Sequence, residues 1–358
     1  MSPGGSWSRP VFNLNLAAWR AIRNRNRAPV ARGLALRFCL AGGAFSMLGA
    51  LQERMYGRAL ERIEVKSPVF IVGHWRSGTT LLHELLALDE RFAAPDNYAC
   101  FNPHHFLLAR HGAPPKRQLV RPTGDIVVSA FSPQEEEFAL LCLGATSPYE
   151  AFMFPSAMNR LEALSDPDLF EQRERRRWDR AMLWILKATA YVSGAGRRLA
   201  VKSPSNSLRI ARLNTLFPDA SFIRVVREPC AVFSSSLRLW QSMWERYALT
   251  PPLGQDALVE RVLQAGLALE RKLQHGLRGL PEDRAATVRY EDLVADPHGT
   301  IERLYQRLML GNPSSALDKV GRYMDCNSPR PLASADDWKP LVQRRWSALF
   351  DEFGYTLN

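Results

Sequence analysis

The chain has 358 residues, 46% of them hydrophobic and 23% charged, a composition that argues against a disordered protein and allows a sizeable core. Its formal net charge of +11 favours an anionic partner, such as nucleotide phosphates or an acidic membrane surface. The sequence has no compact basic motif of a nucleic-acid reader, so we expect no nucleic-acid partner. The five cysteines are scattered without a CxxC pair, which argues against disulfides or a zinc site and favours a reducing, cytoplasmic location.

Residues 1–60 predict a helical extension that precedes the main domain. Residues 1–30 carry several arginines and no long apolar run, which is a poor secretory signal. The nearly uncharged segment Cys39–Leu51 has only thirteen residues, too few to span a bilayer. Flanking arginines make this segment typical of a helix that packs on the domain, which we favour, or of an amphipathic helix at a membrane surface. These arginines are Arg32, Arg37, Arg54 and Arg58.

Beyond residue 60, strand-like apolar runs alternate with segments of helical periodicity. The predicted order is strand 68–73, helix 79–88, a long loop region with short helices at 91–132, helix 138–143, helix 168–192, strand 199–201, helix 206–217, strand 221–226, helices 229–239 and 258–277, strand 286–289 and helix 298–308. This alternation predicts one α/β domain over residues 61–358. We expect a three-layer fold with a central, mostly parallel sheet flanked by helices.

The turn after the first predicted strand has the glycine spacing of a P-loop. Gly73 and Gly78 form the pattern GxxxxG between a buried strand and a helix. In such a turn, backbone N–H groups and the helix dipole favour an anion. Thr79 stands where a nucleotide-triphosphate loop has lysine, and the cation Arg76 lies inside the loop instead. The loop therefore favours a 5'-phosphate ester with a charged group to be transferred over ATP or GTP.

This loop resembles the 5'-phosphosulfate loop of the sulfotransferases that use PAPS (3'-phosphoadenosine-5'-phosphosulfate), in the bacterial-type branch with the sequence RSGTT. The resemblance implies a P-loop-containing fold that binds PAPS as co-substrate, releases adenosine 3',5'-bisphosphate and needs no metal. The loop residues expected to bind PAPS are Gly73, Arg76, Ser77, Gly78, Thr79 and Thr80.

Three further segments resemble the same family. Arg227 follows the predicted strand 221–226 and Ser235 lies eight residues on; in sulfotransferases such a pair holds the 3'-phosphate. A guanidinium fork and a hydroxyl donor suit that role. Lys202, in a Lys-Ser-Pro segment, resembles the lysine that approaches the sulfuryl group. Tyr290, in a Tyr-Glu-Asp segment, resembles the tyrosine near adenine.

The resemblance implies in-line sulfuryl transfer, with Arg76 and Lys202 stabilising charge on the bridging oxygen. The general base stays open, because Pro204 and Asn206 stand where relatives carry histidine. Glutamates in the run 135–137 resemble an acidic motif of relatives, although such a run is also typical of a solvated helix start. The two adjacent histidines more often pack in aromatic loops. The candidates are Glu135, Glu136, Glu137, His104 and His105, of which Glu136, Glu137 and His105 are our predicted catalytic residues.

We therefore predict a PAPS-dependent sulfotransferase that modifies a hydroxyl or amine of a lipid-like or saccharide acceptor. The apolar N-terminal segment and the aromatic stretches 98–111 and 149–154 favour a hydrophobic acceptor, although aromatics also stack on sugars. Two alternatives stay open at this point. One is a P-loop kinase-like phosphotransferase, which the missing loop lysine disfavours. The other is a non-enzymatic protein that binds polyanions or membranes and keeps a degenerate nucleotide pocket.

Overall fold

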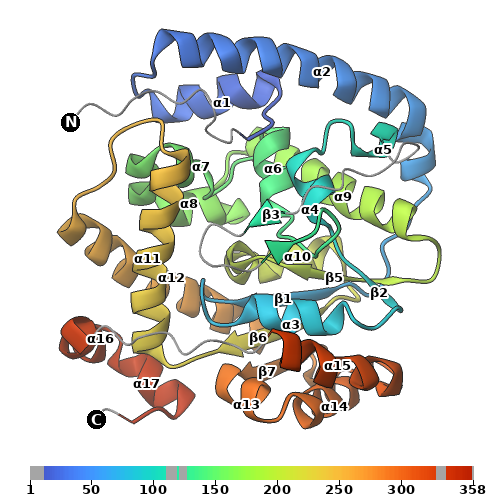
Figure 1. Ribbon diagram of the computed structural model, residues 1–358, viewed down its shortest axis with the longest axis vertical. Helices are drawn as coiled ribbons and strands as arrows, with labels where there is room; N and C mark the ends of the chain where they lie inside the picture. Colours follow the sequence, from blue (N-terminus) through green and yellow to red (C-terminus); the bar gives the residue numbers. More distant parts are fainter. Residues whose placement is uncertain (1–11, 110–118, 121–126, 328–335, 357–358) are drawn as a thin grey trace.

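A computed structural model describes residues 12–109, 119–120, 127–327 and 336–356 (Figure 1). Its central sheet has the strand order β2-β5-β1-β6-β7, and each of the four pairings is parallel. The strands are β1 (Val69–Gly73), β2 (Phe92–Ala93), β5 (Arg198–Lys202), β6 (Ser221–Val226) and β7 (Ala285–Arg289). The four predicted strands are confirmed as β1, β5, β6 and β7. The prediction of a mostly parallel sheet is confirmed too.

Two short strands, β3 (Leu119–Val120) and β4 (Val127–Val128), form a separate antiparallel pair within the predicted loop region 91–132. Short helices α4 (Asn97–Phe101) and α5 (Phe106–Ala109) also form there, as expected. Parts of that region and of the N-terminal extension lie outside the described residues.

Side chains that alternate along β1 supply both faces of the sheet. Val69 and Ile71 belong to one apolar cluster, and Phe70 and Val72 to the other. All four are fully buried, which explains why the strand reads as an unbroken apolar run rather than as an alternating one.

One face of the sheet is covered by helices that the lower part of Figure 1 shows. They are α3 (Thr79–Leu86), α13 (Tyr290–Ala295), α14 (Pro297–Arg307) and α15 (Ser314–Cys326). Leu82 and Leu86 of α3 pack with Leu304 of α14 and Val320 of α15 on this face. The other face carries α6 (Glu137–Leu143), α8 (Leu161–Ser165), α9 (Gln172–Ser193), α10 (Ile210–Leu216), α11 (Pro229–Tyr247) and α12 (Gln255–Arg278), with α7 (Glu150–Met153). The chain closes with α16 (Lys339–Arg345) and α17 (Ser347–Phe353). The predicted three layers are thus confirmed.

Some element boundaries differ from those predicted. The helix expected at 168–192 is α9, which begins at Gln172, because Pro167–Leu169 forms a 3₁₀ turn (η2) capped by the Asp166 side chain. The helix expected at 206–217 begins as a 3₁₀ turn, η3 (Pro204–Leu208), with proline at its first position, before α10. The helix expected at 229–239 is α11, which continues to Tyr247.

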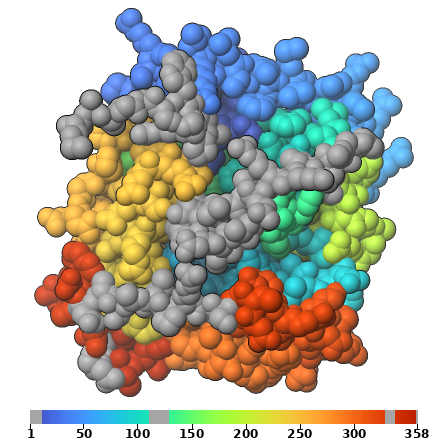
Figure 2. All heavy atoms as spheres, viewed as in Figure 1, coloured from blue at the N-terminus to red at the C-terminus, as the bar shows by residue number. Residues whose placement is uncertain are grey.

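The N-terminal extension forms two helices, α1 (Leu16–Asn26) and α2 (Arg32–Glu61), that cover one end of the molecule (Figures 1 and 2). Trp19 and Ile22 of α1 and Phe38 of α2 belong to the same apolar cluster as the sheet. The segment Cys39–Leu51 is only the middle of the 30-residue α2, which is long and apolar enough to cross a membrane by length and composition. The prediction that this apolar segment is too short to span a bilayer was wrong about its length. It counted only the uncharged residues 39–51, whereas the helix continues through the charged residues on either side.

Candidate active site

The parallel strands bring four predicted site segments to one edge of the sheet. Gly73 ends β1, Lys202 ends β5, and Arg227 and Tyr290 directly follow β6 and β7. Carboxyl ends of parallel strands share an edge, which is where ligands bind in open α/β sheets. The fold therefore explains why motifs that lie far apart in the sequence occur together.

The loop from β1 to α3 depends on two glycines. Gly73 has φ +143°, and a Cβ there would lie 2.5 Å from the Val225 carbonyl oxygen. Gly78 has φ +100°, and a Cβ there would lie 2.3 Å from Cδ2 of Tyr290. The Gly73 N–H donates to Oγ of Ser207 at 2.8 Å, a contact that the sequence did not predict. Only glycine combines these φ angles with such close neighbours.

Arg76, Arg227, Ser235 and Tyr290 meet around this loop. Arg76 has φ +72°, a left-handed conformation, and its Nε donates to Oγ of Ser235 at 2.8 Å. Arg227 donates from Nη1 to the Arg76 carbonyl oxygen at 3.4 Å. The Arg227 guanidinium lies over the Tyr290 ring, 4.0 Å from its centroid. The tyrosine side chain in turn packs against Gly78. The structure thus brings both predicted anchors into one cluster.

Buried hydroxyl groups lie near the same strand ends. Oγ of Ser77, Ser203 and Ser205 is buried and has no hydrogen-bond partner within the described part of the chain. Buried polar groups are normally paired, so unpaired hydroxyls near the strand ends that carry Gly73 and Lys202 fit a site that receives an oxyanion. Thr79 is buried and Thr80 half-buried at the start of α3. Ser77 was predicted as a site residue; Ser203 belongs to the Lys-Ser-Pro segment but was given no role, and Ser205 was not singled out.

Lys202 is paired with Glu135. Nζ of Lys202 and the hydroxyl of Tyr149 both donate to the Glu135 carboxylate, one to each oxygen. The Lys202 side chain is nearly buried, and 16% of the Glu135 side chain is exposed. A carboxylate, an ammonium and a phenol thus share one hydrogen-bonded group at the end of β5. Glu135 was among the candidates, but Tyr149 had been noted only as part of an aromatic stretch.

Glu136 and Glu137 have other surroundings. Glu136 is fully buried and accepts from Nδ2 of Asn206 at 2.7 Å, while its Oε2 has no partner among the described residues. Burial and the charge of Glu137 raise the pKa of Glu136 to about 7. Glu137 forms a fully buried ion pair with Arg209, which also donates to the Ser165 carbonyl oxygen at 2.6 Å. The Glu137 carboxylate is therefore used in joining three segments of the core.

The two histidines lie against α2 rather than beside Lys202. Nε2 of His104 is 3.1 Å from the Cys142 carbonyl oxygen. The His105 ring stacks on Phe45 of α2 with centroids 6.0 Å apart. Burial lowers the pKa of both rings, that of His104 to about 4. Neither histidine contacts Arg76 or Lys202 within the described residues.

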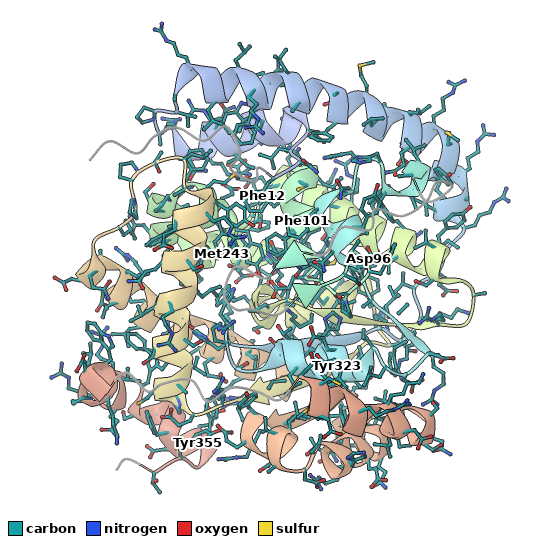
Figure 3. The ribbon with its side chains drawn as sticks, viewed as in Figure 1. Phe12, Asp96, Phe101, Met243, Tyr323 and Tyr355 are labelled. Atoms are coloured by element: carbon teal, nitrogen blue, oxygen red, sulfur yellow. The ribbon has the colours of Figure 1, made fainter. Side chains whose placement is uncertain are left out.

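An aromatic cluster extends from the Glu135 group towards α1. Ring centroids are 4.9 Å apart between Phe138 and Tyr149, 4.6 Å between Tyr149 and Phe152, and 5.0 Å between Phe152 and Trp240. Phe12 and Phe101 join it beside Phe138, in the part of the molecule below α1 (Figure 3). We call these residues, with Trp75 and Tyr247, the aromatic cluster. Its member Tyr149 brings an aromatic ring to Glu135, and its member Trp75 directly precedes Arg76.

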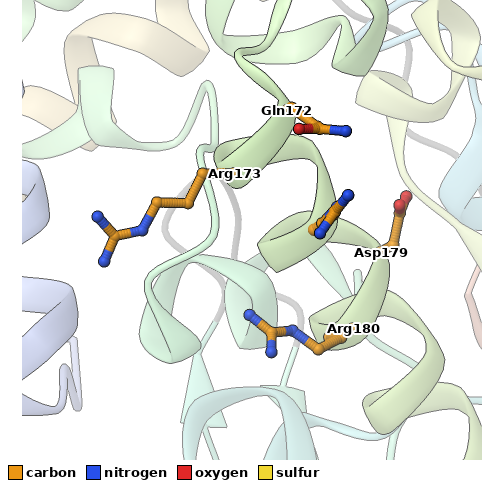
Figure 4. A pocket seen from close by; sticks show the side chains of 5 residues that line it. Gln172, Arg173, Asp179 and Arg180 are labelled. Atoms are coloured by element: carbon orange, nitrogen blue, oxygen red, sulfur yellow. The ribbon is translucent and has the colours of Figure 1, made fainter.

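Two surface hollows lie away from this site. One, of about 500 Å³, is lined by Gln172, Arg173, Arg176, Asp179 and Arg180 of α9 (Figure 4). The other, of about 930 Å³, lies along β7 and α14. Neither is lined by a predicted site residue. Among the residues that the structure describes, no group of three or more His, Cys, Asp or Glu side chains could hold a metal ion.

Comparisons with known proteins agree on one family. A model described as "Sulfotransferase family" matches residues 68–311. The omega-hydroxy-beta-dihydromenaquinone-9 sulfotransferase Stf3 of Mycobacterium tuberculosis and that of Mycobacterium bovis are each 33% identical over 98% of this chain and 92% of their own length. The crystal structure of sulfotransferase STF1 from M. tuberculosis has a TM-score of 0.67 at 20% identity, covering 92% of this chain and 90% of its own. That of STF9 from Mycobacterium avium also has 0.67, at 16% identity, covering 98% and 99%.

Proposed function

The chain belongs to the sulfotransferase family, and we propose that it transfers a sulfuryl group from PAPS to a hydroxyl group of a lipid-like acceptor. The observation that carries this proposal is the cluster of Arg76, Arg227, Ser235 and Tyr290 around the loop 73–80, with Lys202 at the end of the neighbouring strand. Family membership sets the chain apart from P-loop kinases and from non-enzymatic polyanion-binding proteins.

The donor site follows from the cluster. The N–H groups of the loop and the start of α3 would hold the 5'-phosphosulfate, with the Ser77 hydroxyl as one further donor. Arg227 and Ser235 would bind the 3'-phosphate, and the Tyr290 ring would lie beside the adenine. Arg227 already packs on Tyr290, so the phosphate anchor and the aromatic surface are held relative to each other.

In the transfer step, an acceptor oxygen attacks sulfur and the bond from sulfur to the bridging oxygen breaks. Negative charge grows on that oxygen, where Arg76 and Lys202 would stabilise it. Glu135 would remove the acceptor proton, because its carboxylate lies against Lys202 and is partly exposed. The Tyr149 hydroxyl, which donates to Glu135, would orient the carboxylate. This assignment prefers Glu135 over the predicted bases Glu136, Glu137 and His105.

The acceptor proposal rests on the aromatic cluster and on the relatives. Tyr149 bonds to Glu135 and packs with Phe138 and Phe152, so the surroundings of the proposed base are apolar, which suits a hydrophobic acceptor. The two Stf3 relatives are named as sulfotransferases of omega-hydroxy-beta-dihydromenaquinone-9. We infer a hydroxyl compound with an apolar tail, of the menaquinone type, as the acceptor class.

The test is a transfer assay with the full chain, labelled PAPS and an omega-hydroxylated dihydromenaquinone in detergent. Label should enter the lipid. Arg76→Ala should lower the rate about 100-fold or more, the usual cost of removing a preplaced charge stabiliser. Arg238→Ala is the control, because Arg238 is exposed on α11 only three residues beyond Ser235. A normal rate in the Arg76 variant would overturn this mechanism.

Nucleotide specificity separates the donor proposal from a kinase-like site. Adenosine 3',5'-bisphosphate should raise the melting temperature of the wild-type protein, whereas ATP with Mg²⁺ should raise it less or not at all. Arg227→Ala should lose most of the shift. A larger shift with ATP and Mg²⁺ than with adenosine 3',5'-bisphosphate would count against PAPS as donor. This test needs no acceptor, so it stays informative where the transfer assay fails for lack of the right acceptor.

A further inference from the structure

We propose that the outer face of α2, together with the arginines that flank it, docks on a lipid bilayer rich in anionic headgroups. This inference rests on the proposed function in one respect: the lipid acceptor explains why docking on a bilayer would be useful. The evidence for docking comes from α2, a part of the molecule distant from the donor site. It gives the enzyme a surface on which a membrane-dissolved acceptor would be found.

The outer face of α2 is apolar and exposed. Leu36, Leu40, Met47, Leu51 and Met55 are between 48% and 76% exposed, and they are five of the nine large hydrophobic side chains that are exposed in the described chain. No charged residue occurs between Arg37 and Glu53. A contiguous exposed apolar strip of this kind marks an interaction surface in a soluble domain.

The inner face of the same helix is held by the protein. Phe38 stacks on Trp19 of α1 with ring centroids 4.2 Å apart, and Tyr56 is buried. The side chain of Gln52 is buried, donates to the Pro103 carbonyl oxygen at 2.7 Å and accepts from the Leu107 N–H at 2.8 Å. A helix with one face bound in this way lies along a bilayer surface; crossing the bilayer would expose these polar bonds to lipid.

Charge selects the bilayer over other occupants. Residues 16–62 contain nine arginines and two glutamates, so this segment carries +7 of the chain's net +11. Arg37, Arg54 and Arg58 are exposed along α2, and Arg20 and Arg27 on α1. A second copy docked face to face would set these arginines against one another, whereas anionic headgroups complement them. Apolar side chains flanked by arginine are the usual composition of an interfacial helix.

The face is connected to the site through α1. Phe12 lies four residues before the start of α1 and contacts Phe138 and Tyr247 of the aromatic cluster, and Asn13 donates from Nδ2 to the Phe101 carbonyl oxygen at 3.0 Å. The aromatic side of the site therefore lies below the helices that would rest on lipid (Figures 1 and 3).

The experiment is flotation of the full-length protein with vesicles of phosphatidylcholine alone or mixed with phosphatidylglycerol. The wild-type protein should float with the mixed vesicles, and less with neutral vesicles or at high salt. Met47→Glu should weaken binding roughly tenfold or more, because it places a carboxylate in the apolar strip. Met309→Glu is the matched control, since Met309 is also 76% exposed but lies after α14, and its binding should be unchanged.

Three outcomes would overturn the proposal. Equal binding by the two variants would show that the strip does not touch lipid. Protein that resists alkaline extraction from cell membranes would indicate a spanning α2. Wild-type dimers that dissociate on Met47→Glu, without vesicle binding, would indicate a second copy. The rate of sulfuryl transfer to a detergent-dissolved acceptor separates this proposal from the proposed function. If the proposed function and the membrane proposal both hold, Met47→Glu should keep the wild-type transfer rate while it loses vesicle binding.

Discussion

Three consecutive glutamates at the start of α6 have different surroundings, although they are neighbours in the sequence. Glu135 is partly exposed and paired with Lys202, Glu136 is buried beside Asn206, and Glu137 is buried against Arg209. Only the first of these carboxylates is bonded to a residue of the proposed transfer machinery. Glu135 is therefore the proposed base, Glu136 is a buried acid, and Glu137 belongs to a structural ion pair.

Glu135→Gln should remove the general base while keeping the shape of the side chain. We expect kcat for sulfuryl transfer to fall by about 10²- to 10⁴-fold, the usual contribution of a positioned base. The melting-temperature shift caused by adenosine 3',5'-bisphosphate should stay, because the donor residues Arg227 and Ser235 are untouched. A variant that loses the nucleotide shift together with its activity would instead indicate that Glu135 only holds Lys202 in place.

Glu136→Gln is the control for Glu135→Gln. The difference in melting temperature between this variant and the wild-type should depend on pH with a defined sign. The pKa of Glu136 is raised from 4.5 to about 7, so between these values the folded wild-type keeps a proton that the unfolded chain has lost. The stability that Glu136 contributes to the wild-type therefore falls as pH rises through this window. Its amide replacement does not titrate, so the melting temperature of the variant should gain on that of the wild-type between pH 5 and pH 8. A constant difference would mean that the carboxyl is not held neutral.

Sequence patterns predicted the cluster at the proposed donor site better than the contacts at the proposed acceptor side. Arg76, Arg227 and Tyr290 follow strands in recognisable motifs, and parallel strand ends must share an edge. The partner of Lys202 was not predictable, because Tyr149 and Glu135 come from different segments that only tertiary packing joins. His105, which the sequence had favoured less than the glutamates, stacks its ring on Phe45.

At the scale of elements, the loop from β1 to α3 is shaped by a second element, α13. Gly78 is the N-cap of α3, and Tyr290, the first residue of α13, fills the space where a side chain at position 78 would lie. The loop, the phosphate anchor Arg227 and the tyrosine thus form one packed unit. A substitution of Gly78 should therefore weaken nucleotide binding more than it destabilises the fold.

Gly78→Ala should therefore weaken nucleotide binding. Its Cβ would meet the Tyr290 ring at 2.3 Å, so the ring must move from its place beside Arg227. We expect the melting-temperature shift with adenosine 3',5'-bisphosphate to shrink strongly. Gly194→Ala is the control, because Gly194 also has positive φ, +87°, but nothing lies within 4 Å of its Cβ position. Both variants carry a backbone cost of about 1 kcal/mol, and only the first should lose binding.

Element lengths show why the sequence located strands better than it located α2. Buried strands such as β6 are short apolar runs bounded by turn residues; the ends of β6 were predicted to the residue, and those of β1, β5 and β7 to within one residue. The helix α2 keeps its helical geometry through the charged turns at both ends, where hydropathy no longer marks it. Strand β2 has two residues, too few for any pattern, and exists because β5 offers it an edge.

For the whole molecule, the attachment of α2 decides whether the N-terminal helices act as part of the enzyme. Phe38, Tyr56 and Leu60 of α2 pack in the main apolar cluster, and Gln52 supplies a buried polar contact by bridging Pro103 and Leu107 ahead of and within α5. These two bonds restrain the rotation of α2 about its axis, together with the bonds of Ser46 and Glu53, and so help to set which side chains face outwards. The proposed membrane face therefore depends on a buried amide on the opposite side of the helix.

Gln52→Leu should loosen α2 without unfolding the sheet. The substitution leaves the Pro103 carbonyl and the Leu107 N–H buried without their partner, at a cost of about 1–3 kcal/mol for each group. Hydrogen exchange should therefore quicken in peptides from residues 32–61 and 103–109, and stay slow in β1. Gln241→Leu is the control, because Gln241 is exposed and bonds only to the Gln255 side chain at 2.8 Å, so exchange in α2 should not change. Equal exchange of α2 in both variants would mean that the other contacts of α2 set the rotation of the helix, and the outward face would then not depend on the amide.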